Sequence, residues 1–251
     1  MSNKGNPVHQ DLFTIPESDI AVISLMGDVL MRDIQMVMEK SRIDELLESK
    51  VSRTKHKNLV CGVGSYDVTF PSKISIDGKR YRHRAFEVWR GMLRRCYCPH
   101  KEQDRKTYAG CMVSDAWLRF SGFLAFWKAN YREGWQLDKD LLFPGNKIYS
   151  ADRCVFVPPV LNSFVTDKEH AKAQYPKGVR LSAYATKFEA RICLDGKRKS
   201  LGCFDTPQRA HLAWHAAKLD LITHWKSICD NIHPQLYSGI VAKVQSMLEV
   251  E

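Results

Sequence analysis

The sequence predicts an α+β protein in which helices and small antiparallel sheets alternate along the chain. Two Asp-Gly pairs, at 77–78 and 195–196, lie between short runs of apolar and β-branched residues, which is typical of β-hairpins. Segments 85–97 and 113–131 carry apolar residues at helical spacing. The 251 residues are 44% hydrophobic and 26% charged, a composition that indicates a folded globular chain.

Residues 1–58 are predicted to form an acidic amphipathic helix followed by a basic linker. Within 17–50, one helical face carries an apolar stripe made of Ile23, Met26, Leu30, Ile34 and Val37. Residues 1–50 hold 5 Lys/Arg against 9 Asp/Glu, a net charge of −4. Two interpretations stay open: the stripe packs on the rest of the chain, or residues 17–50 bind a second copy or a partner protein.

The remainder of the chain is basic, with 33 Lys/Arg against 19 Asp/Glu in residues 51–251. Such a balance favours a polyanionic partner, because Lys and Arg release counterions from phosphates. The apolar run 20–38 is interrupted by Asp28, Arg32 and Asp33, so no membrane partner is expected. We recognise no signal peptide and expect a cytoplasmic location, in which the eight cysteines are thiols or metal ligands rather than disulfides.

The central region, residues 59–172, is predicted to contain a hairpin, two helices and a strand–loop–strand segment. The first helix, 85–97, places Phe86, Trp89, Met92 and Leu93 on one face. The second, 113–131, contributes mostly core residues, which are Trp117, Phe120, Phe123, Leu124 and Trp127. The segment WQLDKDLLFPGNKIYSADRCVFVP, residues 135–158, reads as two apolar strands around a Gly-Asn loop, with Asp138 at the end of the first strand.

The third region, residues 173–251, is predicted to form a three-stranded sheet with one helix on one face. The strands are expected at 178–181, 188–194 and 200–204, and the turn at 195–196 joins the last two. Thr206 is expected to cap a helix that begins with Pro207. The residues that this helix should bury are Ala210, Leu212, Ala213, Ala216, Ala217 and Leu219. A last helix is predicted at 234–249, and the second face of the sheet is left open.

Four motifs of the third region resemble the plant ethylene-response-factor (APETALA-type) DNA-binding domain. They are Lys-Gly-Val at 177–179, KFEARI at 187–192, LGCFDT at 201–206 and the alanine-rich helix that follows. The resemblance implies that the sheet enters the major groove of double-stranded DNA while the helix supports it. The implied base contacts are Arg180, Phe188, Arg191, Arg198 and Ser200, and the implied phosphate contacts are Lys187, Lys197 and Lys199. Cys193 and Ser200 replace an arginine and a tryptophan of that family, so its target sequence is not implied.

The central region resembles the HNH (His-Me finger) endonucleases of phages, in particular a group with a Leu-Asp-Lys-Asp motif. The matched positions are Trp89, Met92, Arg95, Cys96, Tyr97, Tyr108, Gly110, Cys111, Trp117, Phe120, 137–140, 145–150, 154–158 and Asn162. The resemblance implies an HNH-like ββα finger region between the N-terminal helix and the sheet domain. It also implies that Asp138 and Asn162 hold one divalent metal, Mg²⁺ or Mn²⁺, and that Asn146 orients the base or contacts phosphate.

Lys139 departs from this family, because a histidine that deprotonates water is expected directly after Asp138. Lysine ionises near pH 10.4, and neighbouring carboxylates raise its pKa further, so Lys139 suits a fixed cation for phosphate better than a base. Asp140 is then the remaining candidate base, although on a strand it shares its face with Asp138 rather than with Lys139.

Zinc is a further hypothesis for the cysteines of the central region. Cys96, Cys98, Cys111 and Cys154, with His100 nearby, include enough ligands for a tetrahedral site. Their spacing is not the paired Cys-x2-Cys of a strong zinc motif, so the sequence does not favour zinc. His211, His215 and His224 lie at near-helical spacing, and a solvated or half-buried helix face is favoured over a metal stripe there.

Together the motifs predict a phage protein that binds double-stranded DNA and resembles HNH homing endonucleases, acting in the cytoplasm of the host cell. Metal-dependent nicking or cleavage near the bound site is the activity that the resemblance implies. Two other hypotheses stay open. One is a non-catalytic DNA-binding regulator, and the other is an inhibitor or adaptor that binds a host protein through residues 17–50.

Overall fold

The computed structural model describes residues 39–52, 58–166, 174–182, 186–194 and 197–248. The architecture is mixed α+β with small sheets, as predicted. Residues 39–48 are helical, and the other helices are α2 (Arg84–Tyr97), α3 (Glu102–Thr107), α4 (Asp115–Leu118), α5 (Phe120–Asn130), α6 (Pro159–Thr166), α7 (Pro207–Thr223), α8 (Lys226–Ile232) and α9 (Leu236–Gln245). The strands are β1 (Lys73–Ile76), β2 (Lys79–Arg82), β3 (Met112–Val113), β4 (Gln136–Asp138), β5 (Ile148–Tyr149), β6 (Val155–Val157), β7 (Val179–Leu181), β8 (Phe188–Leu194) and β9 (Lys197–Phe204).

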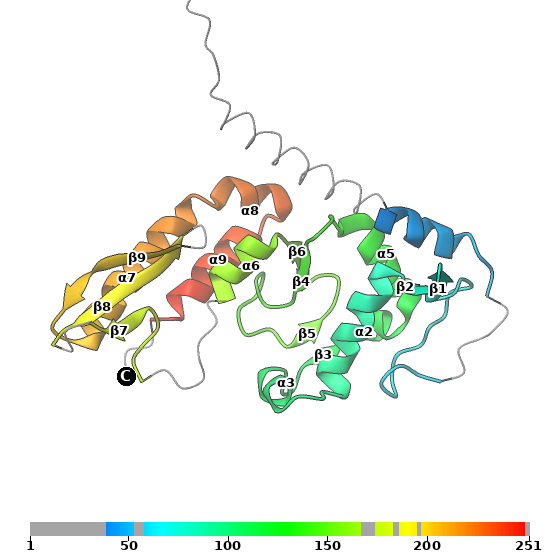
Figure 1. The fold of residues 1–251 in the computed structure, drawn as a ribbon, viewed down its shortest axis with the longest axis horizontal. Helices are drawn as coiled ribbons and strands as arrows, with labels where there is room; N and C mark the ends of the chain where they lie inside the picture. Colours follow the sequence, from blue (N-terminus) through cyan, green and yellow to red (C-terminus); the bar gives the residue numbers. More distant parts are fainter. Residues whose placement is uncertain (1–38, 53–57, 167–173, 183–185, 195–196, 249–251) are drawn as a thin grey trace, which may run out of the picture.

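The molecule is elongated, with the β7–β9 sheet at one end and the β1–β2 hairpin at the other (Figure 1). The hairpin turns at Asp77 and Gly78, as the sequence predicted, and both residues have positive φ, 49° and 74°. Two left-handed residues make the tight turn whose twist matches the flanking strands, which is why Asp-Gly is favoured there.

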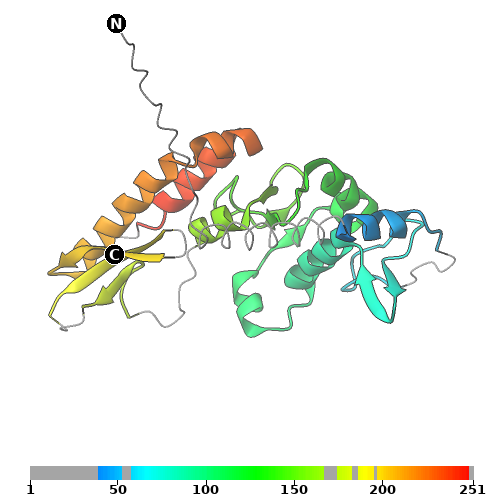
Figure 2. The ribbon, with the colours of Figure 1, turned by 45° about the horizontal axis from the view of Figure 1, so that its top comes forward.

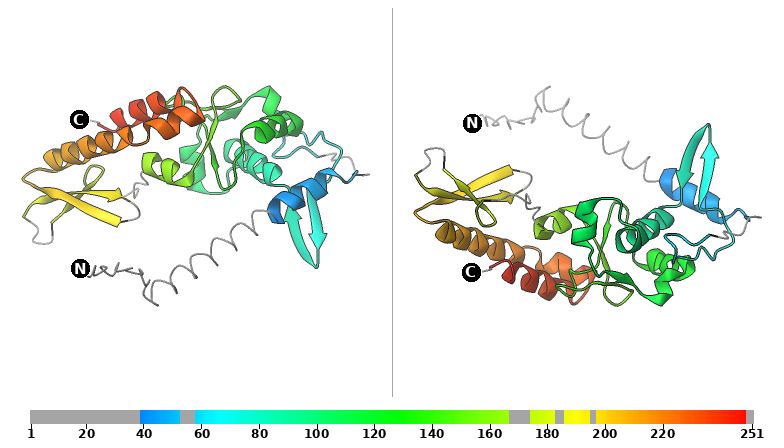
Figure 3. Two further views of the ribbon diagram at one scale, coloured as in Figure 1. Left: turned by 90° about the horizontal axis from the view of Figure 1, so that it is seen from above. Right: turned by 90° about the horizontal axis from the view of Figure 1, so that it is seen from below.

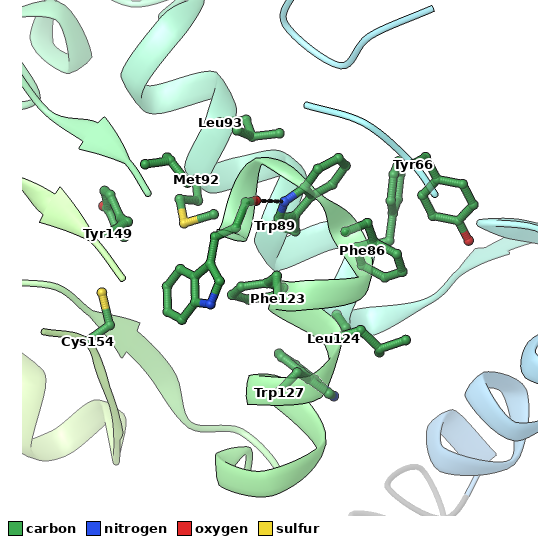
Figure 4. Packing of buried hydrophobic residues seen from close by; sticks show 14 of the residues in the cluster. Tyr66, Phe86, Trp89, Met92, Leu93, Phe123, Leu124, Trp127, Tyr149 and Cys154 are labelled. Atoms are coloured by element: carbon green, nitrogen blue, oxygen red, sulfur yellow. Dashed lines mark hydrogen bonds between the residues drawn. The ribbon is translucent and has the colours of Figure 1, made fainter. Parts of the chain in front are cut away.

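The first hydrophobic core joins α2 to α5, and the amphipathic helix predicted at 85–97 is confirmed. Phe86, Trp89, Met92 and Leu93 are buried on one face of α2. Figure 4 shows the aromatic side chains of this core, with the indole N–H of Trp89 donating to the carbonyl of Trp117 at 2.6 Å. That hydrogen bond satisfies a polar group that burial would otherwise leave costly.

The prediction of a single helix at 113–131 is wrong in one respect, because the helix is interrupted at Arg119. Arg119 has extended backbone angles between α4 and α5. The backbone of Ser65 takes its place in the hydrogen bonding: Ser65 N–H donates to Leu118 O at 2.8 Å, and Phe120 N–H donates to Ser65 O at 2.9 Å. A segment more than fifty residues away in sequence therefore interrupts the helix.

Residues 136–166 form a ββα unit, in which β4 pairs antiparallel with β6 and α6 follows. β6 is buried on both faces: Phe156 packs in the first core, whereas Val155 and Val157 pack in a second one. The C-terminal helices complete this second core with Ile222, Cys229, Leu236, Ile240 and Val244. The predicted domain boundary at 172/173 lies outside the described residues, and the described segments on its two sides share this core.

The third region forms an antiparallel sheet in the order β7-β8-β9, with α7 packed on one face (Figures 2 and 3). Ala190 and Ile192 of β8 meet Ala210 and Trp214 of α7 in a third core. β9 begins three residues earlier than predicted, and the turn at 195–196 lies outside the described residues. The predicted cap is confirmed, because the side chain of Thr206 accepts a hydrogen bond from Arg209 N–H at 3.2 Å.

The helix at residues 39–48, which falls within the predicted N-terminal helix, packs on the body of the protein. Ile43 and Leu47 are buried, and Asp44 forms an ion pair with Arg84 at 2.6 Å. Glu48 accepts hydrogen bonds from buried His83 and from Lys128. Residues 17–38 with the apolar stripe lie outside the described residues, so self-association or partner binding there stays a prediction. None of the described helices combines the length and the apolar character needed to cross a membrane.

Candidate nucleic-acid interface and cleft

A cleft of about 630 Å³ lies where the ββα unit meets α2, α3 and α9. Asp138, Lys139 and Asp140, at and just after the end of β4, line this cleft together with Asn162 of α6. Four of the five residues that the sequence suggested for a metal-dependent site are therefore in one place. The cleft has the size of ordinary ligand sites, which span roughly 300–1,000 Å³.

Asp138 is held by the backbone that follows it. Its Oδ1 accepts hydrogen bonds from Asp140 N–H at 2.8 Å and from Leu141 N–H at 3.0 Å. Burial foremost, and the charge of Asp140 beside it, raise the pKa of Asp138 to about 6, although Lys243 acts in the opposite direction. A cation bound in the cleft would stabilise the ionised form of this buried carboxylate.

Asp140 is held by two lysines. Its Oδ1 lies 2.7 Å from the Nζ of Lys243, and its Oδ2 lies 3.5 Å from the Nζ of Lys139. Burial opposes its ionisation, but these ammonium groups and the contact with Asp138 lower the pKa of Asp140 overall. Lys139 also donates to the carbonyl of Asn146 at 2.8 Å. It is therefore a fixed cation, in agreement with the argument against lysine as a base.

Asn146 lies beside the cleft and is hydrogen-bonded to Lys139, the residue at the position of the base, so its role in orienting that residue stays a prediction. Its side-chain amide is buried and donates to Lys139 O at 2.6 Å and to Ile148 O at 2.8 Å, while its Oδ1 accepts from Ile148 N–H. These bonds close the loop between β4 and β5, and Asn146 is not among the residues that line the cleft. Asn162 does face the cleft, and its Nδ2 donates to Gln136 Oε1 at 2.8 Å.

Lys243 was not predicted from the sequence, since it lies on a helix 103 positions after Asp140. α9 reaches the cleft because Gly239 packs directly on the chain after Asp140. A Cβ at Gly239 would lie 2.0 Å from Leu141 O and 2.7 Å from Leu142 O. One helical turn further on, Lys243 then meets Asp140. No local sequence pattern reports such a contact.

The sheet presents a basic face on the side away from α7. Cross-strand partners lie on the same face of a sheet, and the register pairs Arg180 with Glu189, Arg191 with Ser200, and Cys193 with Arg198. Their neighbours Ala190 and Ile192 point to α7. No described element covers the arginine-bearing face in Figure 3. We call Arg180, Glu189, Arg191, Arg198 and Ser200 the outer face.

Glu189, which the sequence analysis did not single out, organises the outer face. Arg180 contacts Glu189 through Nε at 2.7 Å and through Nη2 at 2.6 Å, and the Nε of Arg191 lies 3.9 Å away. Hydrogen bonds from Ser200 and Arg180 lower the pKa of Glu189. The carboxylate therefore stays ionised and holds two guanidinium groups in defined positions.

The remaining predicted contacts divide between the two sides of the sheet. Phe188 pairs with Leu181 and Phe204 and packs in the third core, so its expected base contact is corrected to a packing role. The parity of β8 is the reason, because Phe188 points the same way as Ala190. Lys187, Lys197 and Lys199 are exposed, and Lys187 forms an ion pair with Asp205 at 3.3 Å. The register pairs Lys199 with Ile192 and Lys197 with Leu194, so these two lysines belong to the face toward α7 rather than to the outer face.

The cysteines differ from the sequence prediction of thiols or ligands, because Cys61 and Cys98 form a disulfide with a Cα–Cα distance of 5.9 Å. Cys98 caps the C-terminal end of α2, and the turn at Cys61 brings the two together. Within the described ranges, no group of three or more His, Cys, Asp or Glu side chains is arranged to hold a metal ion. His211 and His215 are buried, with ring nitrogens 2.9–3.2 Å from the backbone carbonyls of Lys177, Val244 and Met247.

These features define an α+β protein with a cleft lined by both carboxylates and basic side chains at the end of a ββα unit, and with a basic, open sheet face. Comparison with protein-family models, with curated proteins and with solved structures finds no match for the chain.

Proposed function

We propose that the protein binds double-stranded DNA through the outer face of the β7–β9 sheet. The observation that carries this proposal is the register, which places Arg180, Arg191 and Arg198 together on the face that α7 leaves open. A two- or three-stranded ribbon fits the major groove, and guanidinium groups bind guanine edges and phosphates. The basic charge of residues 51–251 and the resemblance to the ethylene-response-factor domain support the same partner.

Arg191→Ala and Arg198→Ala are each expected to weaken duplex binding about tenfold, because each removes one arginine from the outer face. Arg209→Ala is the matched control: it removes the same charge from an exposed position on α7, behind the sheet. Fluorescence anisotropy of a labelled duplex at several salt concentrations measures the effect. The slope of the logarithm of the binding constant against the logarithm of the salt concentration measures the number of phosphate contacts. Each lost contact is expected to reduce the magnitude of this slope by about 1. Equal affinities for all three variants would rule out the sheet as the DNA-binding surface.

A second candidate function is metal-dependent DNA nicking in the cleft. The observation that favours it is that the end of β4 and the helix α6 bring Asp138 and Asn162 to the same cleft, as the resemblance to HNH endonucleases implies. Their oxygen atoms fit Mg²⁺ or Mn²⁺, which prefer carboxylate and carbonyl ligands. A bound ion would neutralise charge on a scissile phosphate. The fixed cation Lys139 would then contact phosphate rather than accept a proton.

Asp138→Asn is expected to abolish plasmid nicking with Mg²⁺ or Mn²⁺ and, at the same time, to stabilise the fold above pH 6. The folded-state pKa of Asp138 is raised to about 6 from 3.8, so its stabilising contribution is full below pH 3.8 and is lost as pH rises through about 6. Asparagine removes that loss, which is worth about 1–3 kcal/mol at pH 8. Nicking assays and thermal melting at pH 5 and pH 8 measure both effects.

Asp140→Asn is the contrasting control for stability, because it leaves Lys139 and Lys243 without their carboxylate. It is expected to lower the melting temperature at pH 8, opposite in sign to Asp138→Asn. A wild-type protein that binds duplex DNA and does not nick it with either metal would end the second candidate. The ββα unit would then be a scaffold for a DNA-binding protein.

A further inference from the structure

Arg95, in the last turn of α2, stands at the wall of the cleft that contains Asp138. Its guanidinium carbon lies 5.4 Å from the ring centre of Tyr108 and 6.0 Å from that of Tyr149, and both tyrosines line the cleft. Its Nη1 lies 3.6 Å from where a Cβ on Gly91 would be. Gly91 also lines the cleft, and 3.6 Å is an ordinary van der Waals distance, so the guanidinium group lies beside this turn of α2.

The charge of Arg95 is not balanced by the part of the chain that the structure describes. Its Nε is buried without a hydrogen-bond partner, and its guanidinium group donates a side-chain hydrogen bond to Tyr149. It forms no ion pair with a described carboxylate. The other two cations of the cleft, Lys139 and Lys243, both hold Asp140. Burial foremost raises the pKa of Tyr108 and of Tyr149, so these hydroxyls are neutral at physiological pH and do not balance the charge either.

A half-buried cation without a carboxylate partner is costly, and aromatic contacts offset only part of that cost. Rings above a guanidinium group cover its faces, whereas its N–H groups point outward in the plane. This in-plane fork matches two oxygens of a phosphate group, which makes arginine the side chain best suited to bind phosphate in a partly buried site.

We propose that Arg95 is a phosphate-binding residue of the cleft and holds a phosphate group of a nucleic acid beside Asp138. This proposal depends on the proposed DNA-binding function in one respect only, which is that a nucleic acid supplies the phosphate group. The cleft volume of about 630 Å³ accommodates a nucleotide unit. Asp138 and Asn162 have the complementary role. They offer oxygen ligands to a cation, whereas Arg95 offers hydrogen-bond donors to the phosphate anion.

Arg95→Met tests the proposal, with Arg94→Met as the matched control. The two variants remove the same charge from adjacent residues of α2, and Arg94 is exposed. Inorganic phosphate is titrated at constant ionic strength, and binding is followed by ³¹P NMR or by the shift in melting temperature. The wild type and Arg94→Met are expected to bind phosphate equally, and Arg95→Met about ten- to a hundredfold more weakly. Equal binding by both variants, or no phosphate binding by the wild type, would overturn the proposal.

Circular dichroism shows whether Arg95→Met folds. If it does not, Arg95→Lys keeps the charge and loses the fork, and it is expected to bind phosphate several-fold more weakly than the wild type. If Arg95→Lys bound phosphate with unchanged affinity, bidentate binding of phosphate by Arg95 would be rejected. Competition with a short oligonucleotide identifies the source of the phosphate. Phosphate binding that needs Arg95 in a protein that binds no duplex would uphold this site and overturn only the proposed function.

Discussion

Gly239→Ala is expected to destabilise the protein by about 2–4 kcal/mol and to separate Lys243 from Asp140. The new Cβ would lie 2.0 Å from Leu141 O and 2.7 Å from Leu142 O, and these are backbone atoms that cannot rotate away. Overpacking of this kind typically costs about 1–3 kcal/mol, and a backbone obstacle puts the expected cost at or above the upper end. The gain in helix propensity from glycine to alanine, about 1 kcal/mol, offsets only part of it.

Gly91→Ala is the matched control, since Gly91 also lies inside a helix and its Cβ would make only an ordinary contact at 3.6 Å. That variant is expected to be as stable as the wild type or more so. Urea unfolding of both variants measures the difference. Because α9 carries Lys243, Gly239→Ala is also expected to expose Asp140. Equal stabilities for the two variants would show that α9 does not pack on residues 141–142.

Gly178→Ala is expected to be nearly as destabilising, by about 2–4 kcal/mol, and to weaken duplex binding with it. Gly178 has a φ of +75°, and a Cβ there would lie 2.1 Å from the ring of Trp214. Trp214 fills the third core between the sheet and α7, so β7 must move away from the helix. Gly178 O also accepts a hydrogen bond from Arg191 N–H at 2.8 Å, which couples this packing to the outer face.

Gly134→Ala is the matched control for Gly178→Ala, because it introduces the same backbone strain without a steric clash. Gly134 has the same φ of +75°, but nothing lies within 4 Å of its Cβ position. Its substitution is expected to cost only the strain of the left-handed conformation, about 1–2 kcal/mol. Thermal melting of the two variants, with anisotropy of a labelled duplex, measures both effects. A Gly178→Ala protein as stable as Gly134→Ala would mean that the sheet does not rest on Trp214.

The parts of the fold that the sequence alone predicted are those whose cause is local. The Asp77-Gly78 hairpin follows from two residues that tolerate positive φ. α2 follows from apolar side chains at helical spacing, and α7 begins where Thr206 offers a cap and Pro207 follows. In the site, the resemblance to HNH endonucleases implied that Asp138 and Asn162 lie near one another, and both line the cleft.

Local patterns failed where a distant segment competed with them. The helix at 113–131 breaks at Arg119 because Ser65 takes over its hydrogen bonds. On α7, Leu212 was expected to be buried and is 50% exposed, whereas His211 and Lys218 are buried, because α9 and α6 also pack against this helix. A helix with two packing partners has no single apolar face for periodicity to reveal.

The sequence by itself determined the fold class, the Asp77-Gly78 hairpin, the amphipathic helix α2, the cap of α7 and the acidic strand end at Asp138, since each depends on residues a few positions apart. Tertiary structure alone decided that Lys243 holds Asp140, that Asn146 closes a loop, that Phe188 faces α7 and that Cys61 meets Cys98. Arg95 belongs with the latter group. Folding alone places its charge against the rings of Tyr108 and Tyr149 and away from a described carboxylate partner, because a sequence records a charge without recording what surrounds it.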